Sequence, residues 1–362
     1  MHKYPFYMKA TIVLFGLTLL VYALLNLKGV LVPLAFSVLL AILLNPLVNR
    51  LRQKKVPRVM AIVLALLLSL IIIAGIGYFL SSQIASFSDQ LPLLKKRFAE
   101  LLLKLQQEVK HRFGWNMQKQ HEMINDAQTK IQPLVGQTLG TLAGSLFMMF
   151  LLPVYTFLFL YYKNLLVNFI FEVFAEKNTK EVGVVIAQTR GAIQNYMVGL
   201  LLEALVVAVL NTVALLLLGV DYAILLGVLG AILNVLPYIG GIIAIALPVI
   251  IASITKDGFQ TQLGVIAAYL VIQFIDNHFL VPFLVSSRVK INALISIVIV
   301  LLGDALWGVP GMFLSIPFIG VLKISFDRIP ELKPWGKLLG DEVPTRHKGQ
   351  MRGRKPAPAA AE

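Results

Sequence analysis

Two apolar stretches of the chain, 222–254 and 292–326, are too long for one membrane crossing and are interrupted near their middles. As straight helices rising about 1.5 Å per residue, each would extend roughly 50 Å, whereas the hydrocarbon core of a bilayer is about 30 Å thick. We therefore predict that each stretch is a helix–turn–helix hairpin within the membrane. The interruptions combine glycine and proline with polar side chains: Asn234, Pro237, Tyr238, Gly240 and Gly241 in the first stretch, and Gly303, Asp304, Gly308, Pro310 and Gly311 in the second.

Other apolar runs have the length of a single crossing, about 20 residues. Together with the hairpins they predict an all-α multi-pass membrane protein with about six full spans. The alternative for the hairpins is that proline and glycine only kink two long, tilted helices. The predicted spans are residues 11–27, 30–48, 59–81, 141–162, 197–219 and 262–285.

The segment 82–140 is too polar to cross the membrane and predicts a small amphipathic helical unit outside it. Its first helix carries apolar residues at alternating spacings of four and three, which is a heptad seam. A second helix, near 116–135, is expected to return to the membrane. The seam packs either on that helix or on a neighbouring subunit, and it consists of Phe87, Leu91, Leu94, Phe98, Leu101 and Leu105.

Positive charge predicts the orientation of the chain. Five basic residues and no acidic residue lie between positions 50 and 58, which places this loop in the cytoplasm. Counting the crossings then places both termini in the cytoplasm and 82–140 outside it. The two hairpins enter the membrane from opposite sides. Opposed interrupted elements build the midplane site of inverted-repeat transporters, so we expect the two hairpin tips to approach each other.

Composition favours a lipid bilayer as the main partner of the chain. Hydrophobic residues make up 58% and charged residues only 14%, against about 25% charged in soluble proteins. The net charge of +14 gathers near membrane ends and in the tail, which suits anionic lipid better than nucleic acid. The absence of cysteine excludes disulfides, thiol nucleophiles and cysteine metal sites.

These observations divide the chain into four parts. Residues 1–81 form the N-terminal spans, 82–140 the extracytoplasmic segment and 141–330 a membrane transport core that holds both hairpins. Residues 331–362 form a basic cytoplasmic tail, which is rich in proline and alanine and is expected to be disordered.

Ionisable and amide side chains at membrane depth are costly and are therefore candidates for a solute or ion pathway. Glu203 and Asn211 lie two turns apart in the span 197–219. Glu203 could instead lie at the cytoplasmic interface beside Arg190, and Asn211 could simply bridge two helices. Asp304 is either a pathway residue or a cap for the next helical turn.

A denser polar group, Asp276, Asn277 and His278, lies in the span 262–285, followed by Pro282, which frees a backbone carbonyl. Asp276 and His278 are two positions apart on one helix, so they face different sides. The carboxyl group and neutral oxygens could take up a proton or a cation in turn, with the imidazole as a relay. The alternative is that Asp276 pairs with Arg288 or Lys290 and only fixes the topology.

Four segments of the chain resemble the AI-2 exporter family, also known as AI-2E or PerM-like transporters. They read VPLAFSVLLAILLNPLVNRL, LLLLGVDYAILLGVLGAILNVLPYIGGIIAIALPVII, DNHFLVPFLVSSRVKINALISIVIVLLG and ALWGVPGMFLSIPFIGVLKI. The likeness covers roughly residues 10–330. It implies a multi-pass protein of the cytoplasmic membrane that exports small solutes, with some members linked to autoinducer-2 and some to exchange of sodium or lithium for protons. It also implies a homo-oligomer, with a pentamer as the expected assembly.

The resulting functional hypothesis is an exporter of a small solute, such as an autoinducer-2-like signal, that works by alternating access with ion coupling. A Na⁺(Li⁺)/H⁺ antiporter is the first alternative, and a membrane scaffold without transport is the second. An enzyme is not expected, and neither is a cofactor. His121-Glu122 begins like a zinc-protease motif, but Asn125 stands where the second histidine is required.

Overall fold

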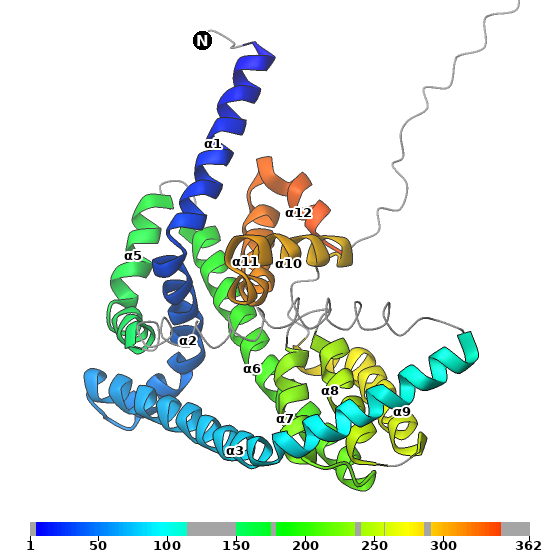
Figure 1. Cartoon of the computed structure of the whole chain (residues 1–362). Helices are drawn as coiled ribbons and strands as arrows, with labels where there is room; N and C mark the ends of the chain where they lie inside the picture. Colours follow the sequence, from blue (N-terminus) through cyan, green and yellow to red (C-terminus); the bar gives the residue numbers. More distant parts are fainter. Residues whose placement is uncertain are drawn as a thin grey trace, which may run out of the picture.

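The computed structural model describes residues 5–113, 150–174, 179–235, 240–256, 258–285 and 291–341 (Figure 1). Within these ranges every regular element is a helix, apart from one isolated bridge between Ile291 and Gly340. Six of these helices are long and apolar enough to cross a membrane, and shorter apolar helices accompany them. The predicted all-α multi-pass fold is therefore confirmed.

The first two predicted spans are α1 (Phe6–Asn26) and α2 (Lys28–Gln53). Figure 1 shows them following one another end to end, with the helical pattern interrupted only at Leu27. None of the described side chains of α1 is buried, although the helix is apolar on all sides. Such a surface has to face lipid or another protein chain.

The third span is the start of α3 (Arg58–Phe113), a single helix of 56 residues. Its first part, Arg58–Phe87, is apolar enough to cross the membrane, and the helix continues without a break into the predicted heptad seam. The first seam residue, Phe87, meets the ring of Tyr222 edge-on at 5.1 Å between centroids. The other five seam side chains and the helix predicted near 116–135 lie outside the described residues.

The predicted span 141–162 is described from residue 150 onward. There the helix Phe150–Tyr161 is followed by α5 (Lys163–Phe174), and the two are bent by 64° relative to each other. At this bend the Arg58 guanidinium donates a hydrogen bond to the Leu160 carbonyl over 3.2 Å. The end of the span is thus fastened to the start of α3.

The helix that packs most extensively on other elements of the described structure is α6 (Thr179–Leu217), which has 39 residues. The sequence predicted a span only over 197–219, and the structure extends the helix back through the more polar residues before it. In Figure 1 α6 runs through the middle of the molecule, with α2 and α11 along one part of it and α7 and α9 along the other.

Both predicted hairpins are present as pairs of helices packed on each other. The first is α7 (Ala223–Asn234) with α8 (Gly240–Thr255), and the second is α10 (Ala293–Trp307) with α11 (Val309–Arg328). Gly308 forms the second break with a φ of +66°, a conformation that glycine adopts without steric cost. The kinked-helix alternative is therefore wrong.

The expected meeting of the two hairpin tips is wrong for the described residues. The hairpins pack on different parts of α6 and have no extensive contact with each other. The physical reason is the length of α6, because a helix of 39 residues offers two separate surfaces. Figure 1 shows the resulting separation between the group α7–α9 and the group α10–α12.

The remaining elements complete these two groups. The helix α9 (Gln260–Ile275) passes directly into the π-helix η1 (Asp276–Val285), and together they form the predicted sixth span. After α11, η2 (Pro330–Leu332) and α12 (Lys333–Leu339) turn back toward the start of α10. Residues 331–341, assigned from the sequence to the tail, are thus part of a helical cap.

Three small apolar cores hold the helices together. One joins α6, α7, α8 and α9 around Val265, one joins α2, α3 and Phe150–Tyr161 around Ile62, and one joins α2, α6 and α11 around Leu314. Many other large apolar side chains are exposed, as expected for a protein whose outer surface faces lipid.

Candidate functional site

Two carboxyl groups meet inside the structure where η1 begins. Asp276 is 2% exposed, and Glu203, on α6, is 7% exposed. Their side chains lie close enough to interact with each other. A hydrogen bond between two carboxyl groups exists only while one of them carries a proton, because an ionised carboxylate has no donor. The pair is therefore a place where one proton can be held between two helices.

The end of the first hairpin supplies a third member of this cluster. The side-chain amide of Asn234, the last residue of α7, donates to Asp276 Oδ2 over 2.8 Å. Asp276 Oδ1 is buried and has no hydrogen-bond partner among the described residues. A buried carboxylate oxygen without a partner is unusual, and it gives the cluster a free acceptor for a proton or a cation.

Gln273, which the sequence did not single out, lies at the edge of the cluster. Its Nε2 is 3.5 Å from Asp276 Oδ2 and 3.4 Å from Asn277 Oδ1. A Cβ added to Gly241 would lie 3.1 Å from Gln273 Oε1, so the glycine leaves room for this amide. Its spacing could have identified Gln273 from the sequence, because a residue three positions before Asp276 shares its helix face.

The backbone fixes the separation of the two carboxyl groups. Asp276 is the first residue of a π-helix, a wider form that often occurs at functional sites. At the other end of that π-helix, the backbone of Leu284 and Val285 lies directly against Gly199 of α6. Gly199 is one helical turn before Glu203. This close approach holds η1, and therefore Asp276, against the helix that carries Glu203.

A second buried polar group lies farther along α6. Asn211 is 2% exposed and is about 12 Å from Glu203 along the helix axis. A Cβ on Gly230 of α7 would lie 3.2 Å from Asn211 Nδ2 and 3.5 Å from Tyr269 Oη. Both Asn211 Oδ1 and Tyr269 Oη are buried without a hydrogen-bond partner among the described residues. Tyr269, which the sequence did not indicate, therefore belongs with Asn211.

Other predicted residues lie away from the carboxyl pair. Asn277 and His278 are exposed, and the His278 ring stacks on Phe274 with centroids 4.3 Å apart. Asp276 and His278 thus face different sides, as their spacing predicted. Asp304 is exposed near the break of the second hairpin, where its carbonyl accepts from the Gly308 amide over 2.7 Å.

Apart from Gly241, the glycines of the predicted set shape the hairpins rather than the cluster. Gly240 packs against the backbone of Leu233, and Gly311 packs against the backbone of Gly303. Pro310 lies in the first turn of α11. Pro237 and Tyr238 lie outside the described residues, and so do Arg288 and Lys290, the alternative partners of Asp276.

The structure favours one of the two readings of Glu203. It places the carboxyl group against Asp276 and not beside Arg190, which lies almost four turns earlier on α6. Among the described residues no group of three or more acidic or histidine side chains could hold a metal ion. The cluster is therefore two carboxyl groups with amide neighbours.

Comparison with known proteins adds an independent line of evidence. The sequence profile described as "AI-2E family transporter" matches residues 10–331. The chain is 23% identical to YrrI of Bacillus subtilis (strain 168) over 310 residues, covering 82% of this chain and 86% of that protein. It is 24% identical to the AI-2 transport protein TqsA of Escherichia coli (strain K12) over 316 residues, covering 86% and 90%.

Proposed function

The chain belongs to the AI-2E transporter family, and on that premise we propose that it exports a small solute by alternating access, with Glu203 and Asp276 coupling export to a cation. The observation that carries this proposal is the buried contact between these two carboxyl groups. In the proposal the protein lies in the cytoplasmic membrane with both termini in the cytoplasm, as the charge pattern predicts.

Coupling follows from the effect of one proton on helix packing. With the proton present, Glu203 and Asp276 share a hydrogen bond and α6 stays close to η1. Without it, two negative charges repel each other in a region of low dielectric constant. The repulsion is relieved by separation of the helices or by entry of another cation. Binding and release of a cation thereby change the contact between α6 and η1.

The proposed solute is autoinducer-2 or a related small polar metabolite. This assignment is supported by the relative TqsA, whose name specifies AI-2 transport, and by the polar groups along α6. Asn211 and Tyr269 offer buried oxygens without a partner among the described residues, and Asn211 is about 12 Å from Glu203 along α6. These groups can exchange hydrogen bonds with a hydroxylated molecule passing between α6, α7 and α9.

A Na⁺(Li⁺)/H⁺ antiporter is a second candidate that a specific observation favours. Hard cations prefer oxygen ligands, and the cluster combines two carboxyl groups with the amides of Asn234 and Gln273. The same pair would then bind the metal ion and the proton in alternation. In this case the cation is itself the cargo, and no organic solute is needed.

Transport by the reconstituted protein tests the proposal. Proteoliposomes are loaded with autoinducer-2 or with radioactive sodium, and efflux is measured with and without a pH gradient. We expect the gradient to accelerate autoinducer-2 efflux at least about tenfold. Glu203→Gln and Asp276→Asn should abolish the acceleration and retain solute exchange, because each variant keeps the hydrogen-bonding shape and removes one charge.

Matched controls and outcomes separate the candidates. Glu181→Gln and Asp221→Asn change exposed acids away from the cluster and should behave like the unmodified protein. Gradient-driven sodium flux without autoinducer-2 flux would favour the antiporter. Unchanged gradient dependence in both carboxyl variants would assign the pair to structure, and no flux of either substance in the unmodified protein would favour the scaffold.

A further inference from the structure

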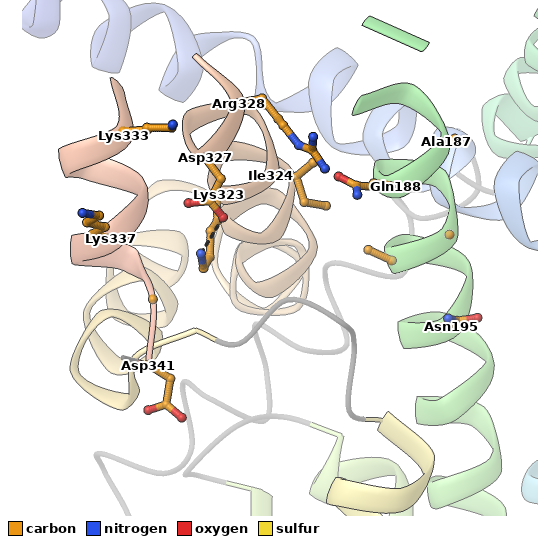
Figure 2. Close-up of a pocket in the computed structure, with 13 residues that line it drawn as sticks. Ala187, Gln188, Asn195, Lys323, Ile324, Asp327, Arg328, Lys333, Lys337 and Asp341 are labelled. Atoms are coloured by element: carbon orange, nitrogen blue, oxygen red, sulfur yellow. Dashed lines mark hydrogen bonds and ion pairs between the residues drawn. The ribbon is translucent and has the colours of Figure 1, made fainter. Parts of the chain in front are cut away.

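A cavity of about 890 Å³ lies between the first half of α6 and the cap formed by α11 and α12 (Figure 2). It is separate from the carboxyl pair, since Asn195, its nearest lining residue on α6, is about 12 Å from Glu203 along the helix. The small side chains on α6 do not fill the space between the helices, and charged residues of the cap line its other side. The lining consists of Ala187, Gln188, Gly191, Ala192, Asn195, Lys323, Ile324, Asp327, Arg328, Lys333, Lys337, Gly340 and Asp341.

Contacts to the second hairpin hold the cap side of this cavity in place. The backbone amide of Asn292 donates to the Leu339 carbonyl over 2.9 Å, and Ile291 forms an isolated bridge with Gly340. Gly336 of α12 packs against the side chain of Asp327. These contacts tie α12 to both arms of the second hairpin, so its lysines stand at set positions around the space.

The charges of the lining do not balance. Four cationic side chains face two acidic ones, which gives a net charge of +2. One of the acids is already engaged, because Lys323 Nζ lies 2.7 Å from Asp327 Oδ2 (Figure 2). Arg328, Lys333 and Lys337 have no carboxylate partner among the described residues. Figure 2 shows Arg328 reaching from the end of α11 toward Gln188 on α6.

We propose that this cavity binds a phosphate-bearing anion. Arginine presents a planar fork that matches phosphate oxygens, and lysines add mobile positive charges around it. The Gln188 amide can donate from the opposite wall. The phosphate belongs to a soluble phosphorylated molecule or to a phospholipid headgroup, which present the same chemistry to these cations.

Binding has a structural consequence beyond the cavity itself. An anion held by Arg328, Lys333 and Gln188 connects the C-terminal cap to α6, the helix that carries Glu203. Occupancy should therefore restrain the movement of α6 relative to α11 and α12. This site requires neither the proposed solute nor the proposed coupling ion.

Direct binding measurements test the site with two probes. In the first, the full chain in nanodiscs of phosphatidylcholine is titrated with inorganic pyrophosphate by calorimetry. In the second, native mass spectrometry counts the phosphatidylglycerol molecules retained by the full chain. The test variant is Arg328→Gln/Lys333→Gln/Lys337→Gln. The control, Lys28→Gln/Lys54→Gln/Lys180→Gln, removes the same charge from exposed positions that do not line the cavity.

We expect the test variant to weaken binding of one probe at least about tenfold and the control to leave it within about twofold. Asp327→Asn should strengthen binding several-fold, because it frees Lys323 for the anion. Pyrophosphate binding identifies a soluble ligand, and phosphatidylglycerol binding alone identifies a lipid headgroup. Absence of both, or equal weakening in the two triple variants, would overturn the site.

Discussion

At the scale of single residues, the hydrogen bond between Asn234 and Asp276 is the most direct link between the first hairpin and the carboxyl pair. Asn234→Ala removes this donor, so that the longer contact from Gln273 is the one amide contact that remains to Asp276 among the described residues. A hydrogen bond to a charged group contributes about 1.5–3 kcal/mol. We therefore expect gradient-driven efflux to fall roughly tenfold or more, measured in proteoliposomes at equal protein content.

The control for that prediction is Asn168→Ala, which changes an exposed asparagine of α5. It should leave efflux within about twofold of the unmodified protein. Full activity of Asn234→Ala would show that Asp276 does not depend on the hairpin for its position.

A second residue-scale prediction concerns Lys163, which follows the predicted span 141–162 at the bend where α5 begins and donates to Asn45 Oδ1 over 3.0 Å. Burial, together with the nearby charges of Arg190, Arg52 and Arg58, lowers the pKa of Lys163 from its ordinary range. A lysine whose pKa is lower in the folded state than in the unfolded state destabilises the fold while it is charged. This cost is present at neutral pH. It disappears as the pH rises from the pKa of the folded state to the pKa of the unfolded state.

Lys163→Gln removes the charge and keeps a donor, so it should raise the melting temperature at neutral pH by roughly 1–3 °C. The advantage should shrink in alkaline buffer, as the lysine of the unmodified protein loses its proton. Thermal unfolding in detergent at both pH values measures the effect, with Lys180→Gln as the exposed control. An advantage that grows with pH would contradict the sign of this argument.

The sequence identified the residues of the site unevenly, for a physical reason. Glu203, Asn234 and Asp276 were predictable because charged or amide groups inside long apolar runs are costly and rare. Gln273 and Tyr269 were missed because such residues occur commonly in helices, and only tertiary packing shows which face each one occupies. His278 lies two positions after Asp276 on the same helix and faces a different side, as that spacing predicted, so its proposed role as a relay stays a prediction.

At the scale of helices, the contact between α6 and η1 depends on Gly199. A Cβ at this position would fall on the backbone of Leu284, and its distance to the Val285 Cα would be 2.8 Å. Gly199→Ala should therefore push η1 away from α6 at a cost of about 1–3 kcal/mol. We expect a lower melting temperature and at least tenfold slower efflux.

Gly320→Ala is the matched control, because it adds the same methyl group to a helix glycine with open space around its Cβ position. Alanine is a better helix former than glycine, so this variant should be neutral or slightly stabilising. Equal behaviour of the two variants would mean that the contact between α6 and η1 is not held by Gly199.

The ends of the helices were predictable where proline and glycine interrupt the apolar runs. The helix ends that were missed have physical causes. Proline and glycine marked both hairpin breaks, because they are poor helix formers and permit a sharp turn. The early start of α6 was missed because residues 179–196 are too polar for a span, and amphipathic pattern alone does not join a polar helix to an apolar one. Which surfaces of α6 the hairpins occupy depends on its length, which the pattern did not reveal.

At the scale of the whole molecule, the apolar surface of α1 is not covered by the other described parts of the same chain. Its described side chains are all at least partly accessible, and its contacts include one hydrogen bond, from the Trp307 indole to the Leu24 carbonyl over 2.9 Å. Lipid could cover such a helix on every side. The homo-oligomer implied by the family resemblance would instead cover one face of it with another copy of the chain.

Disulfide trapping distinguishes these two situations, and the absence of native cysteine makes it clean. Single cysteines at successive exposed positions of α1, such as Leu17, Leu19 and Leu20, are oxidised in membranes and analysed by non-reducing electrophoresis. If α1 packs between subunits, cross-linked dimers should recur at spacings of three and four residues, because only one face of the helix meets the neighbour. Uniformly weak cross-linking around the helix would assign α1 to lipid and leave the oligomer without this contact.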